Sequence, residues 1–311
     1  MESSLVIQAQ KKKKSFNKIN ALFIATCITI PMIDFLVFYV YSNFSSITMA
    51  FQNSKGALSL DNFAMFFKEF QMESSEIKTA FRNTFIIFGV KLVQFPFQVL
   101  VSYFLYKKIP FSGFYRIIFF LPGIIFDVCV AEAFTAMIGV EGPIAQWVGE
   151  VLGLATTPEL LADSRFASIT VIVHMIWLSI PGDLIIWGGT FARIPGDVLE
   201  AAKVDGATWW DEFTKITIPL IWPTFALKTV LLFCGLFNAA GGEFLLTNGG
   251  YNTITISSWM LITLQARSGG NYHSGAYNYM SAVGLIITIV AVAIAQIIRR
   301  ITDKMQENVE Y

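Results

Sequence analysis

The chain has 311 residues, of which 55% are hydrophobic and only 14% are charged. Apolar runs of this extent exceed what one soluble core can bury, so the composition excludes a soluble globular domain and indicates a membrane protein. The 22 basic and 22 acidic residues cancel, so the overall charge gives no reason to expect nucleic acid as a partner.

Runs of about 20 apolar residues bounded by charges predict helices that cross the hydrocarbon core of a bilayer. Six such runs are present, at 21–41, 84–106, 114–137, 167–190, 221–244 and 277–298. The first run follows four lysines at 11–14, as in a signal peptide, but it is too long and lacks a small-residue cleavage site. We therefore expect an all-α, multi-pass membrane protein. Its transmembrane domain is 21–298, between a basic N-terminal tail at 1–20 and a C-terminal tail at 299–311.

Lysine and arginine set the predicted orientation, because basic residues collect on the cytoplasmic side of a membrane. With six spans both termini share one side, which holds the lysines at 11–14, Lys18, Lys107, Lys108, Arg116, Arg193, Lys203, Lys215, Arg299, Arg300 and Lys304. The other side holds Lys55, Lys68, Lys78, Arg82, Arg165 and Arg267. Both termini and the polar segment 193–223 are therefore predicted to be cytoplasmic.

The predicted outer segments, about 42–83, 138–166 and 247–276, are long and rich in Gly, Ser, Asn and acidic residues. They are either surfaces that face an external partner or solvated connecting loops. Cys27, Cys129 and Cys234 fall singly in three apolar runs, where each is most simply a small buried hydrophobe. We predict neither a disulfide nor a metal site, and two histidines form no metal cluster.

Segment 193–223 is a polar insert between the fourth and fifth predicted spans. Pro195 suits a first helical turn, since its missing N–H would be unpaired there, and a short helix is predicted over 195–204. Gly206 follows and is able to take the left-handed conformation that ends a helix. Thr208, with Asp211 three residues later, reads as a capping box that begins a second helix.

The second helix of the insert carries Trp209, Trp210 and Phe213, and we expect Pro219 and Pro223 to end it. The predicted product is a helix-Gly-helix knob. From its pattern alone, the knob either docks a soluble partner or lies at the membrane interface with its aromatic rings at headgroup depth.

A resemblance favours the docking interpretation. Every fixed position of the pattern EAAxxDGAxxxxxFxxIxxPxxxP is matched, by Glu200, Ala201, Ala202, Asp205, Gly206, Ala207, Phe213, Ile216, Pro219 and Pro223. This insert resembles the EAA loop of binding-protein-dependent ATP-binding-cassette (ABC) importer permeases. Tyr115, Arg116 and 119–122 resemble the start of that family's third span, and 194–195 its approach to the loop.

Residues 245–250, LLTNGG, resemble an element typical of carbohydrate importer permeases, specifically the first permease of the maltose or glycerol-phosphate type. Tyr251 stands where that family usually has proline, which leaves the local turn open. The resemblance implies the type I ABC importer permease fold in the plasma (inner) membrane of a prokaryote. It also implies a sugar or oligosaccharide as cargo, although the sequence does not say which.

The resemblance further implies a set of partners. They are a second homologous permease, two ABC ATPase subunits, an extracytoplasmic solute-binding protein and membrane lipid. The EAA knob would sit in a groove of the ATPase, with an acid at Glu200 paired to a basic ATPase residue and a bend at Gly206. The predicted ATPase-coupling residues are Glu200, Ala201, Ala202, Asp205, Gly206, Ala207 and Phe213.

We expect this chain not to be an enzyme. No Lys-Ser or Lys-Thr is preceded by glycine, so the phosphate-binding pattern GxxxxGK[ST] is missing from the sequence. We assign no catalytic residue and no cofactor in this chain, and expect ATP and Mg to be bound by the partner ATPase.

Substrate-pathway residues are carried over from the resembling family residue by residue. They are Trp177, Leu178 and Ser179 before the EAA loop, and Phe237 and Asn238 before LLTNGG. Aromatic faces stack on sugar rings and amides bond to hydroxyls, but Trp and Phe in a helix bundle are normally packing residues. Gly235, Gly241 and Gly242 either break the fifth helix and expose backbone to a cavity or allow close helix packing.

Several ionisable residues lie in or near the predicted spans, where charge is expensive and usually faces a protein interior or wet cavity. They are Asp34, Lys91, Asp127, Glu132, His174, Asp183 and Lys228. We expect Asp183 and Lys228 to snorkel toward the interface, whereas Asp34 and Lys91 lie deeper. Those two leave open an ion-gradient-driven secondary carrier, although no internal repeat supports it. A non-transporting membrane scaffold is a third possibility.

Overall fold

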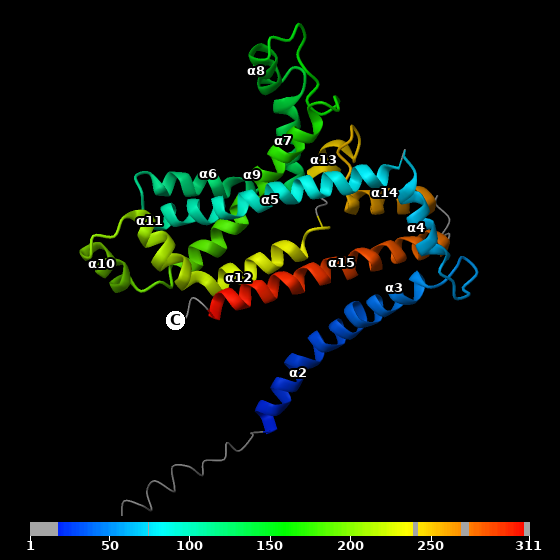
Figure 1. Ribbon diagram of the computed structural model, residues 1–311, viewed down its shortest axis with the longest axis horizontal. Coiled ribbons are helices and arrows are strands. Elements are labelled where there is room, and N and C mark those ends of the chain that lie inside the picture. The colour runs from blue at the N-terminus through cyan, green and yellow to red at the C-terminus, as the bar shows by residue number, and fades with distance from the viewer. Residues whose placement is uncertain (1–17, 74, 239–241, 269–273, 308–311) are drawn as a thin grey trace, which may run out of the picture.

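The computed structural model describes residues 18–73, 75–238, 242–268 and 274–307. The lysines at 11–14 and Gly241 lie outside this part of the chain. Four long helices form the body: α5 (Glu76–Tyr106), α9 (Ala167–Phe191), α12 (Ile218–Cys234) and α15 (Ser274–Glu307). Helix α5 packs against α9 and α12 packs against α15, so segments far apart in sequence lie side by side (Figure 1).

The all-α, multi-pass class is confirmed. Five helices are long and apolar enough to cross a membrane: Phe23–Ala50, Glu76–Tyr106, Ala167–Phe191, Trp209–Cys234 and Gly275–Met305. A sixth span is possible if a bent pair, α6 (Ser112–Ile124) and α7 (Asp127–Ile138), counts as one.

The predicted span 114–137 does not form one continuous helix, because α6 and α7 meet at an angle of 106°. The backbone is extended at Ile125 and Phe126, with ψ of 143° and 130°. Pro122 lies in the last turn of α6, where it lacks the N–H that continues a helical hydrogen-bond series. Asp127 then begins α7, an N-terminal position that suits an acid.

The prediction that Pro219 and Pro223 end a separate helix is also wrong. Short α11 (Trp209–Asp211), the π-helix η2 (Glu212–Thr217) and α12 run on as one helical segment from 209 to 234. The wider turns of η2 change the hydrogen-bond register just before Pro219, which then occupies the first turn of α12. The segment ends at Cys234, ten residues before the predicted end of the fifth span at 244.

The other long helices extend past their predicted ends. The first is built from α2 (Lys18–Asp34), the π-helix η1 (Phe35–Tyr41) and α3 (Ser42–Ala50). Its α3 end packs against α15, and α2 leads away from the bundle (Figure 1). Helix α15 continues to Glu307, so much of the predicted C-terminal tail 299–311 is helical. The predicted outer segments also contain short helices: α4 (Asp61–Gln71), α8 (Pro143–Val151) and α14 (Ile256–Ser268).

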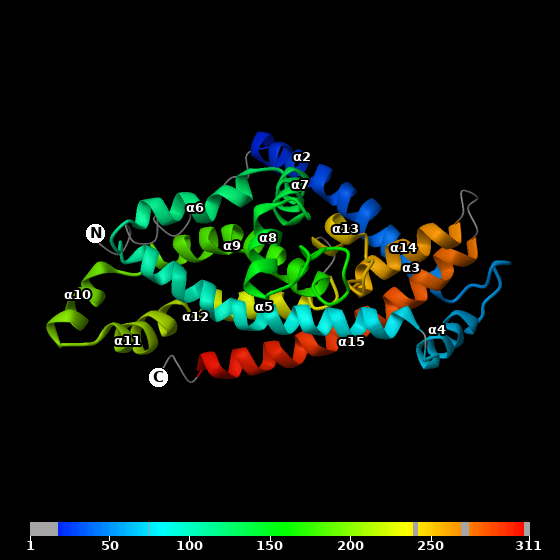
Figure 2. The same cartoon turned by 90° about the horizontal axis from the view of Figure 1, so that it is seen from above.

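Two apolar clusters hold the bundle at opposite ends. One centres on α14 and α15 and includes Trp259, Tyr279 and Val283. The other joins α5, α9 and the polar insert and includes Tyr103, Phe191 and Phe213. The insert itself extends beyond the ends of the helices that it connects (Figure 2). The body is therefore packed at both ends, with a polar space between them.

Candidate functional site

The polar insert forms the knob that the sequence predicts. Helix α10 (Gly196–Val204) follows Pro195 and ends at Gly206, whose φ is +76°. The Ala207 N–H donates to the Ala202 carbonyl at 3.0 Å and the Gly206 N–H to the Lys203 carbonyl at 3.1 Å. These two bonds make a Schellman motif, which closes the helix end.

The second half of the knob begins at the predicted cap. The Asp211 N–H donates to Thr208 Oγ1 at 3.2 Å, which satisfies one of the free amides of the helix N-terminus. Thr208 Oγ1 also donates to the Asp211 carboxylate at 2.5 Å. Both contacts are local in sequence, which is why the residue types predict them.

The predicted coupling residues divide between an exposed face and a buried one. Glu200, Ala201, Asp205 and Gly206 are exposed and Ala207 is half-buried, whereas Ala202 and Phe213 are buried. Apolar side chains lie open beside the exposed group, with Val204 at 87%, Trp209 at 52% and Trp210 at 54% exposure. An exposed patch of mixed acidic and large apolar groups on a protruding element suits a protein partner.

An ion pair ties the knob to the end of α5. Lys107 Nζ lies 2.5 and 2.7 Å from the two carboxylate oxygens of Glu212, and the Tyr103 hydroxyl donates to the same carboxylate at 3.1 Å. The Glu212 side chain is only 5% exposed. Losing either donor would leave the buried Glu212 carboxylate poorly solvated, which costs free energy. This contact between the knob and the end of α5, the Glu212 joint, is therefore expected to be rigid.

Aromatic packing surrounds this joint. The Tyr103 and Phe213 rings lie 4.9 Å apart, and those of Phe104 and Trp209 5.5 Å apart. Leu199 of α10 belongs to the same buried cluster. Both halves of the knob are thus packed against the end of α5.

Lys107 and Glu212 form a contact between the knob and the bundle that the sequence analysis missed. Lys107 served only as a marker of topology, and Glu212 was given no role. The two are 105 positions apart, and no local pattern pairs residues at that separation. The available signal was an acid beside Phe213, a position that the motif match placed in the knob.

A cavity of about 290 Å³ opens between α5, α9 and α12. It is lined by Lys91, Gln94, Phe95, Gln98, Ser179, Asp183, Lys228, Leu231, Leu232, Gly235 and Asn238. Many of these side chains are polar although they come from helices apolar enough to span a membrane. Such residues are expected to face a wet pathway and not lipid.

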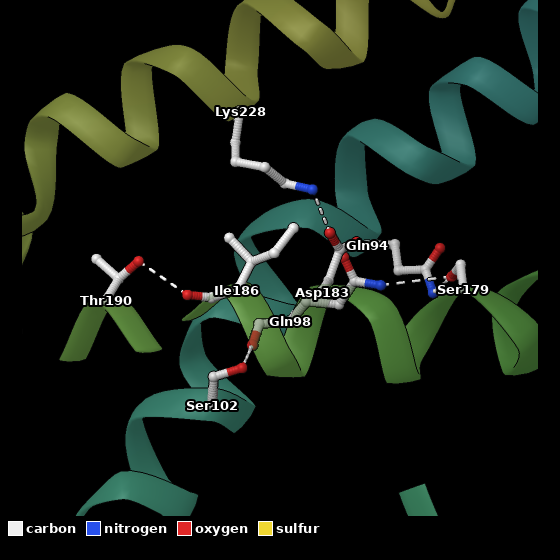
Figure 3. A network of polar contacts seen from close by, with 8 residues as sticks. All are labelled: Gln94, Gln98, Ser102, Ser179, Asp183, Ile186, Thr190 and Lys228. Atoms are coloured by element: carbon white, nitrogen blue, oxygen red, sulfur yellow. Dashed lines mark hydrogen bonds and ion pairs between the residues drawn. The ribbon is translucent and has the colours of Figure 1, made fainter. Parts of the chain in front are cut away.

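The walls of the cavity are bonded to one another across helices, as Figure 3 shows. Gln94 Nε2 donates to Ser179 Oγ at 2.6 Å and to the Ile176 carbonyl at 2.9 Å. Lys228 of α12 forms an ion pair with Asp183 of α9. Their side chains are 20% and 22% exposed, so the prediction that they snorkel to the interface is wrong. Each is instead the other's counter-ion.

The five predicted substrate-pathway residues are not all brought together. Ser179 and Asn238 line the cavity. Phe237 is buried, edge-on to Phe81 and Phe85 at 6.3 and 6.1 Å, and it lines a neighbouring pocket together with Asn238. Trp177 and Leu178 lie off the cavity lining, and Trp177 is 40% exposed.

Gln94 and Gln98 line the cavity but were missed by the sequence analysis. With Lys91 they stand at i, i+3 and i+7 on α5, which is the spacing of one helix face. That spacing was a usable signal. Of the other ionisable residues noted, Asp34, Asp127 and Glu132 are exposed, whereas His174 is fully buried against Phe134, with ring centres 4.8 Å apart.

The LLTNGG element, residues 245–250, comprises the last residues of α13 (Gly242–Thr247) and the start of the turn that follows. Asn248, Gly249, Tyr251 and Asn252 have positive φ, and Tyr251 is at +53°. Proline is restricted to φ near −65°, so the Tyr251 conformation is one that the family's usual proline does not allow. Asn83 Nδ2 donates to the carbonyls of Asn252 and Ile254 at 2.5 and 2.9 Å, which docks the turn on α5.

The comparisons with known proteins agree on one family. The model of the "Binding-protein-dependent transport system inner membrane component" family matches residues 6–307. The chain is similar to the multiple sugar-binding transport system permease protein MsmF of Streptococcus mutans, at 24% identity over 85% of this chain and 90% of that protein. It is 28% identical to the maltose/maltodextrin permease MalF of Vibrio cholerae over 74% of this chain and 46% of MalF.

A solved structure shows the same fold. It is a bacterial alginate ABC transporter in complex with an alginate pentasaccharide-bound periplasmic protein. One of its chains superposes with a TM-score of 0.76 over 94% of this chain and 99% of that chain, at 23% identity. At that identity the likeness concerns the fold alone.

Proposed function

Because the chain belongs to the family of binding-protein-dependent transport system inner membrane components, we propose that it is a transmembrane subunit of an ABC importer that takes up a sugar or oligosaccharide. The observation that carries the proposal is the knob. It presents Glu200 at its surface and is joined through Glu212 and Lys107 to a helix that lines the polar cavity.

The knob is the proposed contact with a separate ATPase, and it lies on the cytoplasmic side together with both termini. Glu200 is the acid that pairs with a basic ATPase residue, and Gly206 provides the bend between the two helices. Exposed Trp209, Trp210 and Val204 supply apolar contact area around that pair.

Coupling follows from rigid connections. When two ATPases close on ATP, they displace the knob, and the knob moves α5 through the Glu212 joint and the aromatic cluster. Helix α5 contributes Lys91, Gln94 and Gln98 to the cavity, so its movement changes access to that space. Packed interfaces have discrete arrangements, and a switch between inward and outward access uses that property.

The partners follow from the same proposal. A second permease completes the pathway, two ATPases supply the energy, and an extracytoplasmic binding protein delivers cargo. The names of the relatives support a carbohydrate, since MsmF and MalF are described as sugar permeases and the alginate transporter was solved with its periplasmic protein. The amides and hydroxyls of the cavity wall suit sugar hydroxyls.

The test is a double substitution in the knob, Glu200→Lys with Gly206→Asp, in cells that depend on this chain for uptake of a glycan. The reversed charge and the strained bend remove ATPase docking, so we expect uptake to fall at least about 100-fold, a loss of roughly 3 kcal/mol of coupling. The protein still inserts, as immunoblots of membranes would show. Normal uptake by the double variant defeats the proposal.

Co-purification in detergent separates an importer from an ion-driven carrier. An ATPase that stays bound to the unaltered chain and is lost from the double variant supports the importer. Uptake by this chain alone, driven by an ion gradient in proteoliposomes, would instead establish the carrier.

A further inference from the structure

Lys91 is the ionisable residue of the cavity wall that has no counter-ion in contact. Lys228 and Asp183 neutralise each other. No hydrogen bond or ion pair joins the Lys91 ammonium to another residue in the part of the chain that the structure describes. Its side chain is half-buried in the middle of α5, far from either end of that helix.

Glu243 is an acid whose charge acts on Lys91 through space, and it is not among the residues that line the cavity. Glu243 is fully buried, and one of its oxygens accepts hydrogen bonds from Thr255 and Ser258 at 2.6 and 2.7 Å. Its charge offsets that of Lys91 through space without occupying the ammonium donors. The cavity wall itself carries two cations and one anion.

We propose that this importer takes up acidic glycans and that Lys91 selects them by pairing with a cargo anion, a carboxylate or sulfate. This inference rests on the proposed function. An ammonium without a counter-ion in contact inside a membrane protein is stabilised most by an anion. An acidic sugar provides that anion together with a ring and hydroxyls. Gln94, Gln98, Ser179 and Asn238 surround Lys91 with groups that bond to those hydroxyls.

The neutral alternative predicts a different wall. The Lys91 ammonium is able to donate hydrogen bonds to the hydroxyls of a neutral sugar, but those bonds bring no negative charge, whereas an anionic cargo supplies both an acceptor and a counter-ion in contact. The Asp183 carboxylate is paired through Oδ1 with Lys228, so its negative charge does not serve as the counter-ion of Lys91. Excess positive charge on the wall therefore favours an acidic cargo.

The first test uses oligosaccharide pools separated by anion exchange into neutral, uronic-acid and sulfated fractions. Cells with the whole transporter are compared with cells lacking only this chain. Loss of uronic-acid or sulfated uptake supports the inference, and the two acidic fractions tell which anion is carried. Loss confined to the neutral pool overturns the inference and leaves the proposed function standing. No loss from any pool overturns both.

The second test uses Lys91→Gln and Lys91→Arg in the complete transporter. Lys91→Gln should lower uptake of the acidic cargo at least about tenfold, mainly through a higher KM, and Lys91→Arg should stay within about threefold. Exposed Lys55 provides the matched control as Lys55→Gln. ATPase co-purification confirms assembly. An assembled Lys91→Gln transporter with unchanged acidic uptake overturns the role of Lys91.

Discussion

Helices α5, α9 and α12 take part in two regions that differ in packing. At the knob end, Tyr103, Phe191 and Phe213 are buried together and the Glu212 side chain is 5% exposed. Further along the same helices the side chains leave about 290 Å³ open, with an ion pair whose members are 20% and 22% exposed. One stretch is a closed joint and the other is a polar space.

The difference teaches how one bundle serves two needs. Under the proposed function, the joint passes movement from the knob and must therefore be rigid, and close packing with a buried ion pair favours rigidity. A pathway must remain unfilled, so its polar side chains are satisfied along the walls, as Gln94 is by Ser179. An ion pair between a lysine and a carboxylate should therefore contribute more to the free energy of unfolding at the joint than in the cavity.

The largest effect is expected from removing the Glu212 carboxylate at the joint. Glu212→Ala leaves Lys107 and Tyr103 without their acceptor, and we expect about 3 kcal/mol of lost stability and uncoupled transport. Thermal unfolding in detergent and uptake with ATP hydrolysis measure the two effects. The exposed i,i+4 pair of Asp211 and Lys215, at 2.6 Å, is the matched control. Asp211→Asn should change neither reading, and an equal loss there would contradict the joint.

A smaller effect is expected at the cavity pair. Asp183→Asn leaves the Lys228 ammonium without a counter-ion and should cost about 1–2 kcal/mol, less than Glu212→Ala because the cavity admits water. Adding Lys228→Met removes the stranded charge and should restore most of the stability. A double-mutant cycle of unfolding midpoints measures the coupling. Additive losses would show that the two residues do not depend on each other.

The smallest effect is expected outside the bundle, where Arg165 bonds bidentately to Asp163 before α9. Hydrogen bonds from Arg165 hold the pKa of Asp163 below its ordinary value of 3.8. A lowered carboxyl pKa stabilises the fold above that ordinary value, and the contribution disappears as pH falls through the folded-state pKa. The pair is solvent-exposed, so the contribution is small and Asp163→Asn should lower the unfolding temperature at pH 7 only slightly. A clear drop would show that this loop carries more than surface charge.

Local chemistry explains which features could be predicted from the sequence. The left-handed Gly206 and the Thr208 cap depend on neighbours within a few positions, so residue types suffice to predict them. The bend between α6 and α7 was missed although Pro122 is visible, because a proline inside an apolar run is compatible with either a continuous or a broken membrane helix. Pro219 was overinterpreted because the π turns before it carry no recognisable sequence signal.

Prediction from the sequence has the same limit for the residues that line the cavity. Ser179 and Asn238 came from a family resemblance, and the structure lays both on the wall. Trp177, taken from the same stretch, points elsewhere. Helix rotation decides which neighbours face a space, and rotation depends on packing partners that are remote in sequence.

The sequence by itself determined the membrane class, the apolar spans and the form of the knob, because hydrophobicity, glycine and capping residues act over a few positions. Only the tertiary structure decided that Lys107 meets Glu212, that Lys228 meets Asp183 and that Lys91 has no partner in contact among the described residues. Pairing of distant charges depends on which helices lie side by side and how each is turned. Those choices result from packing the whole bundle, to which every span contributes.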